Sequence, residues 1–420
     1  MKSSVAKGTV TAPPSKSFTH RAMVLGALTH SHFALRNPLM SDDTVATLDA
    51  LHALGAEIRS TSTGMRITCE ELRPAYSVID SKNSGTTLRL MSGIASLLPS
   101  TTTLTGDESL LRRPMGPLVD ALSQLGATCA YLGKEGKPPV AITGPITNTI
   151  AELPGGVSSQ FVSSLLIACS QKKNDTRLWI KGELRSRPYV DITIKMLREF
   201  GAELDAGADE FVIKGEQPLT RDSYDVPGDY SSASFPLAAG LITHGEVTVR
   251  NLDKESPQGD RAIVSHLESF GAEVTVKGDS IKVSSSGTLT GTQIDVRHTP
   301  DLFPVLAVIG ATAKGETVLT GGENLREKES DRIATTTRFL REMGADIKPT
   351  DDGCRIVGVQ RLHGAAIETD GDHRIMMSAV VAGLSASSET SIQDADSFKV
   401  SYPGFLRDLH QLGCRVAVRK

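Results

Sequence analysis

Positively charged side chains stand at the predicted starts of several apolar helices. In the segment PPSKSFTHR (13–21), Lys16 and Arg21 lie in and just after the first turn of a helix for which Ser15 is the expected N-cap. A helix N-terminus already carries partial positive charge and free N–H groups, so it favours anions and disfavours cations. The placement of these two cations therefore indicates a bound anion that neutralises them.

The same kind of helix start recurs along the chain. Hydroxyl, amide or basic side chains open three further apolar segments: Asn83, Ser84, Gly85, Thr86 and Arg89; Ser158, Ser159 and Gln160; and His373 and Arg374. A serine at a helix start is by itself most often a simple cap. Repeated cations at buried helix starts have no packing reason, so we expect these ends to converge on a ligand with several negative charges.

A different charged segment, NLREKESDRIATTTRFLREMG (324–344), carries both signs of charge. Lys328 and Arg332 are like charges at i,i+4, which repel each other unless an anion lies between them. Glu329 in the same turn could orient a cation or move a proton. A solvated helix face is the simpler interpretation of such a run, and Asp301 is by itself typical of a first-turn helix acid.

The elements that must position these residues form an internal repeat. Six amphipathic helices end at a glycine that an apolar strand residue follows, with spacings of 71, 75, 70, 73 and 69 residues, at Gly55, Gly126, Gly201, Gly271, Gly344 and Gly413. We expect each glycine to end its helix in a left-handed conformation. A second helix, apolar nearly all round and therefore buried, recurs in step at 15–28, 84–98, 158–170, 230–242, 299–313 and 371–384. With flanking strands, the unit is strand–helix–strand–helix–strand–strand.

A chain of 420 residues is longer than a single hydrophobic core usually accommodates, so we expect the six units to form two domains of three units each. The segment VPGD (226–229) is the candidate crossover. The predicted domains are 13–225 and 226–420; that residues 1–12 join the second domain, with the ligand cleft between the two, is what the family resemblance given below implies.

Composition narrows the functional class. A net charge of −4 and 4% aromatic residues disfavour nucleic acid or an acidic membrane as a partner. The five cysteines are widely separated and show no metal-ligand spacing, which is typical of reduced thiols. The first residues resemble no signal peptide, and no apolar stretch approaches the ~18 residues of a membrane span. We therefore expect a cytoplasmic protein.

Seven short motifs, taken in chain order, resemble the 5-enolpyruvylshikimate-3-phosphate synthase family: PPSKSFTHR, NSGTTLR (83–89), RRPMGPLVDAL (112–122), SSQF (158–161), SRPYVDIT (186–193), KESDR (328–332) and DHR (372–374). The resemblance implies an α/β fold of two similar domains, each with three βαβαββ-type units whose helices are buried inside the strands, as in an inside-out α/β barrel. It further implies transfer of the enolpyruvyl group of phosphoenolpyruvate to the 5-hydroxyl of shikimate 3-phosphate, through a tetrahedral intermediate and with release of phosphate. No metal or organic cofactor is implied, and a monomer is expected.

The resemblance also assigns site residues. It makes Asp301 the base at the 5-hydroxyl, Glu329 the acid–base partner at the methylene, and Lys16 a contact to both ligands. The shikimate 3-phosphate set is Lys16, Ser17, Arg21, Ser158, Ser159, Gln160, Ser186, Asp301, Asn324 and Lys328, with Tyr189 framing the site. The phosphoenolpyruvate set is Lys16, Gly85, Arg113, Gln160, Arg332 and Arg374.

One position departs from the family pattern. Many members have a lysine three residues before the proline of SFKVSYPGF, where this chain has Val400. Lys399 is adjacent, but a one-residue shift in an extended segment points to the opposite face. Whether Lys399 replaces the missing cation stays open.

Two alternatives remain. The related transferase that acts on UDP-N-acetylglucosamine would share the fold, but that family has an asparagine after the early lysine and a loop cysteine. Here Ser17 follows Lys16, and segment 112–116 has no cysteine. A non-catalytic, anion-binding paralogue is the other alternative, and the presence of both Asp301 and Glu329 argues against it.

Overall fold

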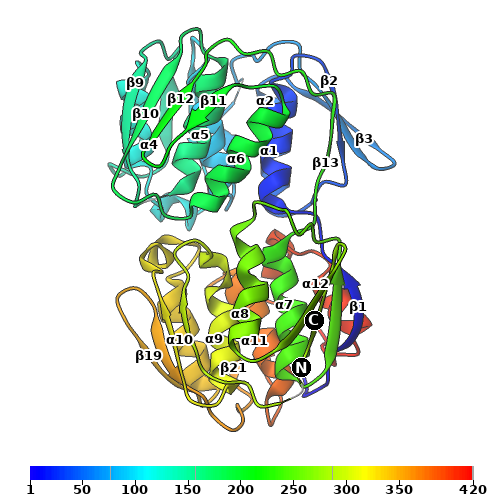
Figure 1. Ribbon diagram of the computed structural model, residues 1–420. Helices are drawn as coiled ribbons and strands as arrows, with labels where there is room; N and C mark the ends of the chain where they lie inside the picture. The colour runs from blue at the N-terminus through cyan, green and yellow to red at the C-terminus, as the bar shows by residue number, and fades with distance from the viewer. Residues whose placement is uncertain (76, 157, 286, 419–420) are drawn as a thin grey trace. The chain divides into compact units, whose positions relative to one another are not determined.

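The computed structural model describes residues 1–75, 77–156, 158–285 and 287–418 (Figure 1). The chain divides into two compact units, Pro14–Val226 and Met1–Pro13 with Pro227–Lys420. These bounds differ by one residue from those expected. The chain therefore passes between the units twice, and its first residues fold with the C-terminal half.

Three four-stranded sheets belong to the Pro14–Val226 unit, and each contains one parallel pair and two antiparallel pairs. The first has the order β13-β2-β4-β3, with β13 (Ser223–Asp225), β2 (His32–Arg36), β4 (Gly64–Thr68) and β3 (Glu57–Thr61). The second is β5 (Ile79–Asp80), β6 (Thr101–Thr105), β8 (Val140–Thr143) and β7 (Thr128–Tyr131). The third is β11 (Leu204–Ala206), β12 (Glu210–Ile213), β10 (Thr176–Lys181) and β9 (Ile150–Pro154).

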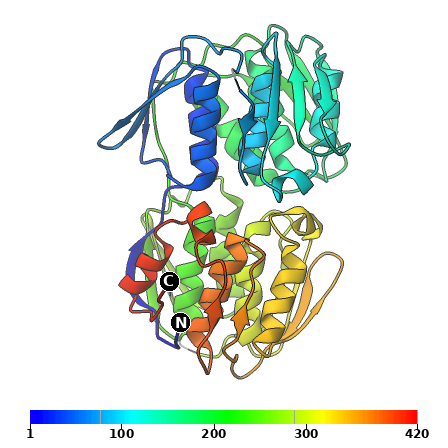
Figure 2. The same ribbon diagram turned by 180° about the vertical axis from the view of Figure 1, so that it is seen from behind.

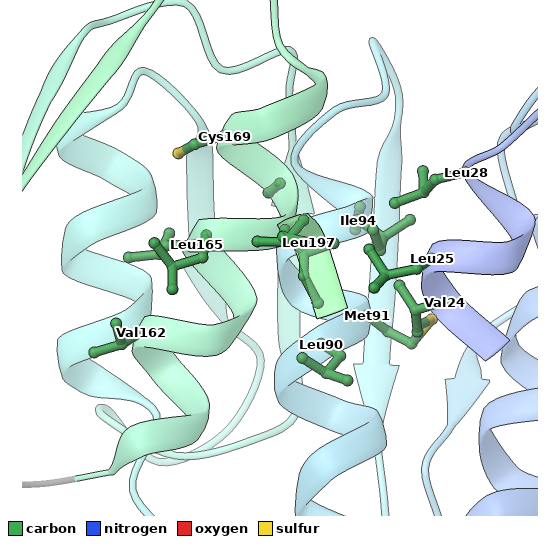
Figure 3. Close-up of a cluster of buried hydrophobic side chains, with 14 of the residues drawn as sticks. Val24, Leu25, Leu28, Leu90, Met91, Ile94, Val162, Leu165, Cys169 and Leu197 are labelled. Carbon is green, nitrogen blue, oxygen red and sulfur yellow. The ribbon is translucent and has the colours of Figure 1, made fainter. Parts of the chain in front are cut away.

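The helices of this unit alternate between buried and half-exposed. The buried ones are α1 (Lys16–Ala27), α3 (Gly85–Ala95) and α5 (Ser159–Gln171). The amphipathic ones are α2 (Asp42–Ala53), α4 (Gly116–Gln124) and α6 (Arg187–Glu199), and a short 3-10 helix spans Leu110–Arg112. Leu25, Met91, Leu165 and Leu197, from α1, α3, α5 and α6, are fully buried in one apolar cluster (Figure 3). The apolar sequence of the buried helices is therefore explained by neighbours on every side.

The second unit repeats this pattern. One sheet is β1 (Lys7–Thr11), β14 (Glu246–Arg250), β16 (Ser280–Ser284) and β15 (Glu273–Lys277), and another is β17 (Gln293–Asp295), β18 (Glu316–Thr320), β20 (Cys354–Val357) and β19 (Asp346–Pro349). The helices are α7 (Tyr230–Ile242), α8 (Ile263–Ser269), α9 (Phe303–Thr312), α10 (Arg332–Glu342), α11 (His373–Ser385) and α12 (Phe405–Gln411). The 3-10 helices are Gly259–Ala262, Pro300–Leu302, Glu323–Glu327 and Ser397–Val400. The buried helices α7, α9 and α11 contact one another. In each unit the sheets lie outside the buried helices (Figures 1 and 2), so the expected α/β repeat architecture is confirmed.

The six predicted glycine ends are also confirmed. Gly55, Gly126, Gly201, Gly271, Gly344 and Gly413 all have φ between +82° and +103°. A side chain other than that of glycine rarely adopts this conformation, so the glycine ends each amphipathic helix and turns the chain into the next strand.

The sixth repeat is shorter than expected. Among the described residues its sheet has only β21 (Ala366–Ile367) and β22 (Ser391–Ile392). Beyond Gly413, the predicted strand is reduced to one bridge between Arg415 and Lys2. The two chain ends therefore meet in the same unit (Figure 2), because the N-terminal segment takes part in closing this repeat.

No described helix is long and apolar enough to cross a membrane.

Candidate active site

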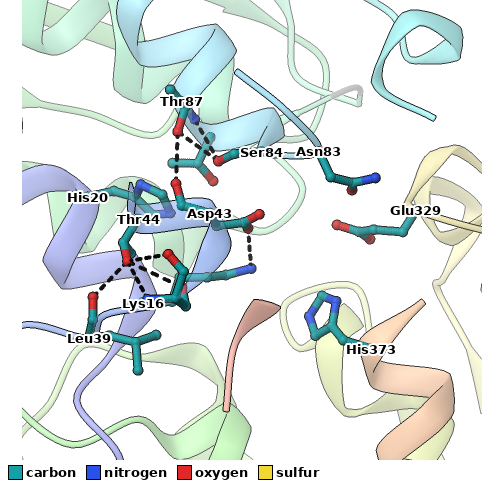
Figure 4. Close-up of polar contacts among 12 residues, drawn as sticks. Lys16, His20, Leu39, Asp43, Thr44, Asn83, Ser84, Thr87, Glu329 and His373 are labelled. Atoms are coloured by element: carbon teal, nitrogen blue, oxygen red, sulfur yellow. Dashed lines mark hydrogen bonds and ion pairs between the residues drawn. The ribbon is translucent and has the colours of Figure 1, made fainter. Parts of the chain in front are cut away.

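The lysine at the start of α1 is paired with a carboxylate of the protein. Lys16 Nζ lies 2.8 Å from Asp43 Oδ2, in the first turn of α2 (Figure 4). Ser15 is the N-cap residue of α1, as predicted, and has the extended backbone of that position, although its hydroxyl makes no capping hydrogen bond. The helix-start pattern indicated a ligand as the group that neutralises Lys16, and Asp43 was not predicted. The available signal was the acidic pair after Ser41, at the start of a helix.

Arg21 is a buried cation that pairs with no carboxylate among the described residues. The residue is 2% exposed, and its guanidinium donates to the hydroxyls of Thr193 (2.6 Å) and Ser163 (3.1 Å). It also donates to the carbonyls of Ser17 (2.9 Å) and Tyr189 (3.0 Å). Burial lowers the pKa of Arg21 to about 10. Within the described parts of the chain no carboxylate pairs with it, so this site has a positive charge that an anion would neutralise.

Two guanidinium groups converge on Gly85, the first residue of α3. A Cβ atom at this position would lie 2.4 Å from Arg89 Nη1 and 3.2 Å from Arg113 Nη1. Arg89 Nη1 donates to Gln160 Oε1 at 2.7 Å, and Arg113 Nη2 donates to Asn83 Oδ1 at 2.7 Å. The predicted residues Gly85, Arg113 and Gln160 therefore lie together, at the N-termini of α3 and α5.

The other serines predicted for the site in this unit, Ser158, Ser159 and Ser186, stand at helix starts. Ser158 caps α5 and accepts from the Gln160 amide at 3.3 Å, and the next residue, Ser159, is buried. Ser186 is the N-cap residue of α6 and has a φ of +53°. Tyr189, one turn later, contributes its backbone carbonyl to Arg21. The prediction that the starts of apolar helices gather polar groups holds for α5, whereas Ser186 at the start of α6 was expected from the family resemblance alone.

In the other unit, Arg332 stands at the centre of three carboxylates. Its Nη1 lies 2.7 Å from Asp301 Oδ1, its Nη2 2.8 Å from Glu329 Oε2, and its Nε 2.8 Å from Asp372 Oδ2. Arg332 is 2% exposed and Asp372 is fully buried. Lys328 and Arg332 were expected to repel each other unless an anion lies between them, and carboxylates of the protein itself supply this negative charge at Arg332.

The second arginine on Asp301 is Arg374, whose Nη2 lies 3.0 Å from Asp301 Oδ2. Asp372 caps α11 by accepting from the Arg374 amide at 2.8 Å and so orients this arginine. Asp372 was missed as a site residue, although it precedes His373 in a recognised motif.

Asp301 is kept ionised by its neighbours. Burial by itself would raise the pKa of this carboxyl, but the charges of Arg374, Arg332 and Lys328 outweigh it and hold the pKa well below its usual range. Lys328 is half-buried and follows the 3-10 helix that carries Asn324. Five of the six predicted residues of this unit, Asp301, Asn324, Lys328, Glu329 and Arg332, thus lie on two adjoining segments, and the sixth, Arg374, joins them from α11.

Lys399 is not placed as expected. Its segment is the 3-10 helix Ser397–Val400 rather than an extended strand, so the argument from opposite strand faces is wrong. Its Nζ forms an exposed ion pair with Asp396 Oδ2 at 2.9 Å.

Asp260 is a buried carboxyl that sequence analysis missed. It lies in the 3-10 helix before α8, is 2% exposed, and accepts a hydrogen bond from the Ser231 hydroxyl. Burial and the charge of Asp301 raise the pKa of Asp260 to about 7, although the Ser231 hydrogen bond acts in the opposite direction.

Replacing Asp260 with Asn is therefore expected to flatten part of the pH dependence of stability. The folded protein keeps a proton on Asp260 between about pH 4 and the folded pKa, whereas the unfolded chain has lost it. Stability from this group is therefore complete below about pH 4 and is lost as the pH rises through about 7. We expect the free energy of unfolding of Asp260→Asn, relative to that of the wild type, to increase over this window. Urea unfolding at a series of pH values measures it, and a difference that does not change between pH 4 and 7 would contradict the prediction.

Within the residues that the structure describes, no group of three or more histidine, cysteine, aspartate or glutamate side chains could hold a metal ion. The chemistry available is that of cations which bind anions and of carboxylates which exchange protons.

Comparison with known proteins places these residues in a family. Residues 1–409 match the family model described as EPSP synthase (3-phosphoshikimate 1-carboxyvinyltransferase). The chain belongs to this family. It is 45% identical over 409 residues to a 3-phosphoshikimate 1-carboxyvinyltransferase of Methanocorpusculum labreanum, with 97% of this chain and 96% of the relative covered. It is also 45% identical over 414 residues to one of Methanocella arvoryzae, with 98% and 97% covered.

Solved structures of the EPSP synthase family share the fold. A 2.37 Å structure of the enzyme from Acinetobacter baumannii has a TM-score of 0.83 at 31% identity, with 100% of this chain and 98% of that chain covered. The family and the fold expected from the seven motifs are thus confirmed.

Proposed function

We propose that the chain transfers the carboxyvinyl group of phosphoenolpyruvate to the 5-hydroxyl of shikimate 3-phosphate and releases inorganic phosphate. Membership of the EPSP synthase family supports this activity and its place in the shikimate pathway, which supplies aromatic amino acids. The observation in the structure that carries the proposal is the arrangement at Asp301, a carboxylate held ionised by two buried arginines. The carboxylate can act as a base, and the two arginines beside it can bind an anion.

The ion pairs at Asp301 suggest how binding and base strength are linked. When the carboxylate of phosphoenolpyruvate binds Arg332 and Arg374, it competes with Asp301 for their N–H groups. The pKa of Asp301 then rises, because the cations that lower it now serve a second anion. Asp301 becomes a better base for the 5-hydroxyl when the second substrate is present.

The reaction then follows as an addition and an elimination. The 5-hydroxyl oxygen attacks C2 of phosphoenolpyruvate while its proton goes to Asp301, and the methylene carbon receives a proton from Glu329. The tetrahedral intermediate loses a proton from the new methyl group back to Glu329 and expels phosphate. The phosphate takes up one proton as it leaves, which balances the hydroxyl proton that Asp301 accepted and returns Asp301 to its ionised form. Lys16 stabilises the charge that develops on the departing phosphate.

The buried charge of Arg21 supports shikimate 3-phosphate as the acceptor. Its proposed binding set consists of Arg21, Ser17 and the serines at the starts of α5 and α6. No carboxylate among the described residues neutralises the positive charge of Arg21, which fits an anionic ligand. That this set and the Asp301 cluster act on the same pair of ligands stays a prediction from the family resemblance. A monomeric, cytoplasmic enzyme also stays a prediction.

Phosphate release from purified protein tests the proposed function. Phosphoenolpyruvate is supplied with shikimate 3-phosphate and, separately, with UDP-N-acetylglucosamine. We expect release only with shikimate 3-phosphate, and a fall in kcat/KM of about 100-fold or more in Lys16→Met. Lys82→Met, which removes an exposed lysine paired with Asp80, is the control and should keep wild-type rates. Release only with the sugar nucleotide would contradict the assignment of shikimate 3-phosphate as the acceptor. No release with either acceptor would favour the interpretation of the chain as a non-catalytic, anion-binding paralogue.

Gly85→Ala is expected to raise the KM for phosphoenolpyruvate about tenfold or more. The new methyl group would meet the ends of the long Arg89 and Arg113 side chains and not backbone atoms, so we expect the fold to be retained while the proposed anion site changes shape. Initial rates at varied phosphoenolpyruvate measure the effect. Gly287→Ala, where a Cβ meets nothing within 4 Å, is the matched control. An unchanged KM in Gly85→Ala would remove Gly85 from the phosphoenolpyruvate site.

A further inference from the structure

The N-terminal turns of three helices of the Pro14–Val226 unit are connected by a network of hydrogen bonds, most of which are buried. Helices α1 and α2 are linked twice. Lys16 Nζ lies 2.8 Å from Asp43 Oδ2 (Figure 4), and one turn later His20 Nδ1 lies 2.7 Å from Thr47 Oγ1. Thr87 of helix α3 contacts both Thr47 and Asp43, the two residues of α2 that form these links. Its hydroxyl lies 2.7 Å from Thr47 Oγ1 and 3.3 Å from the carbonyl oxygen of Asp43.

The same hydroxyl also completes the cap of α3. Thr87 Oγ1 lies 2.8 Å from Ser84 Oγ, which accepts from the Thr87 amide at 3.2 Å. Thr87 stands two residues after Gly85, so its position fixes the start of α3 relative to Asp43 and, through Asp43, to Lys16. The side chains of His20, Thr47, Thr87 and Ser84 are all fully buried, so no water replaces a lost partner.

The direction of the hydrogen bonds follows from His20. Its Nε2 is buried and makes no hydrogen bond within the described residues. An N–H group left without an acceptor is rarer in proteins than an acceptor left without a donor, so the proton belongs on Nδ1. His20 Nδ1–H then donates to Thr47, the Thr47 hydroxyl donates to Thr87, and the Thr87 hydroxyl is directed to Ser84 and the Asp43 carbonyl. Burial and the charges of Lys16 and Arg21 also lower the pKa of His20 well below its ordinary value, which favours the neutral ring.

We propose that the chain of donors from His20 through Thr47 to Thr87 holds Lys16 and the N-terminus of α3 in register for phosphoenolpyruvate. Thr47 and Thr87 are positioning residues, because they act through Lys16, Asp43 and Gly85. This inference rests on the proposed function, since it assigns the ligand between Lys16 and Gly85.

The first test compares hydroxyl removal with hydroxyl retention. Thr87→Val keeps the shape of the side chain and removes the hydroxyl, whereas Thr87→Ser keeps the hydroxyl; Thr47→Val and Thr47→Ser form the second pair. We expect each valine variant to raise the KM for phosphoenolpyruvate about tenfold, and each serine variant to stay within about threefold of wild type. The dissociation constant for shikimate 3-phosphate, measured by calorimetry, should change less, because the hydrogen bonds of Arg21 lie outside this set.

Thr102→Val is the matched control. Thr102 is a buried threonine of the same unit, on β6, and its hydroxyl has no partner among the described residues. Its removal should leave both constants unchanged. If Thr87→Val and Thr47→Val have the wild-type KM, or if Thr102→Val raises it as much as they do, the proposal is wrong.

A second measurement tests the donor chain without reference to turnover. In wild-type protein labelled with [15N]histidine, the pair of ring resonances absent from His20→Gln belongs to His20. We expect a protonated Nδ1 and an unprotonated Nε2 at neutral pH. The opposite tautomer, or a doubly protonated ring, would overturn the proposed direction. A wild-type protein without transferase activity would refute the proposed function, while the NMR result would still decide the structure of the donor chain.

Discussion

Asp301→Asn is expected to lower kcat about 1,000-fold, since the variant loses its proton acceptor for the 5-hydroxyl. The amide also disturbs the anion site. Asp301 accepts from Arg332 with one oxygen and from Arg374 with the other, and an asparagine must turn an N–H donor toward one of these cations. The KM for phosphoenolpyruvate should therefore change as well.

Steady-state kinetics with both substrates varied measure the effect of Asp301→Asn. Asp175→Asn removes a carboxylate from the exposed pair with Lys214 and is the control expected to keep wild-type constants. A kcat within about tenfold of wild type in Asp301→Asn would show that another group accepts the proton.

Arg332→Met is expected to cost about 3–5 kcal/mol in the free energy of unfolding, because it leaves three carboxylates without their shared cation. Asp372 is fully buried and loses its arginine partner, keeping hydrogen bonds from the Ser330 hydroxyl and the Arg374 backbone amide, while Asp301 keeps its ion pair with Arg374. The carboxylates then repel one another, so stability should fall further as they ionise with rising pH. Activity should be lost too, since Arg332 is a proposed phosphoenolpyruvate ligand.

Chemical unfolding followed by circular dichroism measures the stability change. Arg332→Lys keeps the positive charge, but a lysine cannot contact three carboxylates at once. Its free energy of unfolding should therefore lie between those of the wild type and Arg332→Met. Arg338→Met removes the exposed pair with Asp370 and should cost less than about 1 kcal/mol. If Arg332→Met and Arg338→Met are equally stable, the three-carboxylate cluster does not stabilise the fold.

Local rules predicted the repeat because its signals are short-range. A glycine that ends a helix, with an apolar residue after it, depends on a few neighbours only, and all six glycines adopt the expected left-handed conformation. The apolar helix segments were likewise found buried, as in α1, α3 and α5. Where the local signal was weak, the structure differs: the segment around Lys399 and Val400, expected to be extended, is a 3-10 helix, and the strand expected after Gly413 is a single bridge.

The sequence by itself determined the α/β repeat, the family and the residue types of the candidate site, because motifs and helix ends are contiguous in the chain. The tertiary structure decided which charges neutralise which. Lys16 pairs with Asp43, 27 residues away, and Asp301 receives Arg332 and Arg374 across 31 and 73 residues. Such pairs form only when separate helix starts fold onto one another. For this reason the chain pattern could show the cations but could not show Asp43 and Asp372 as their partners, nor that Arg21 pairs with no carboxylate among the described residues.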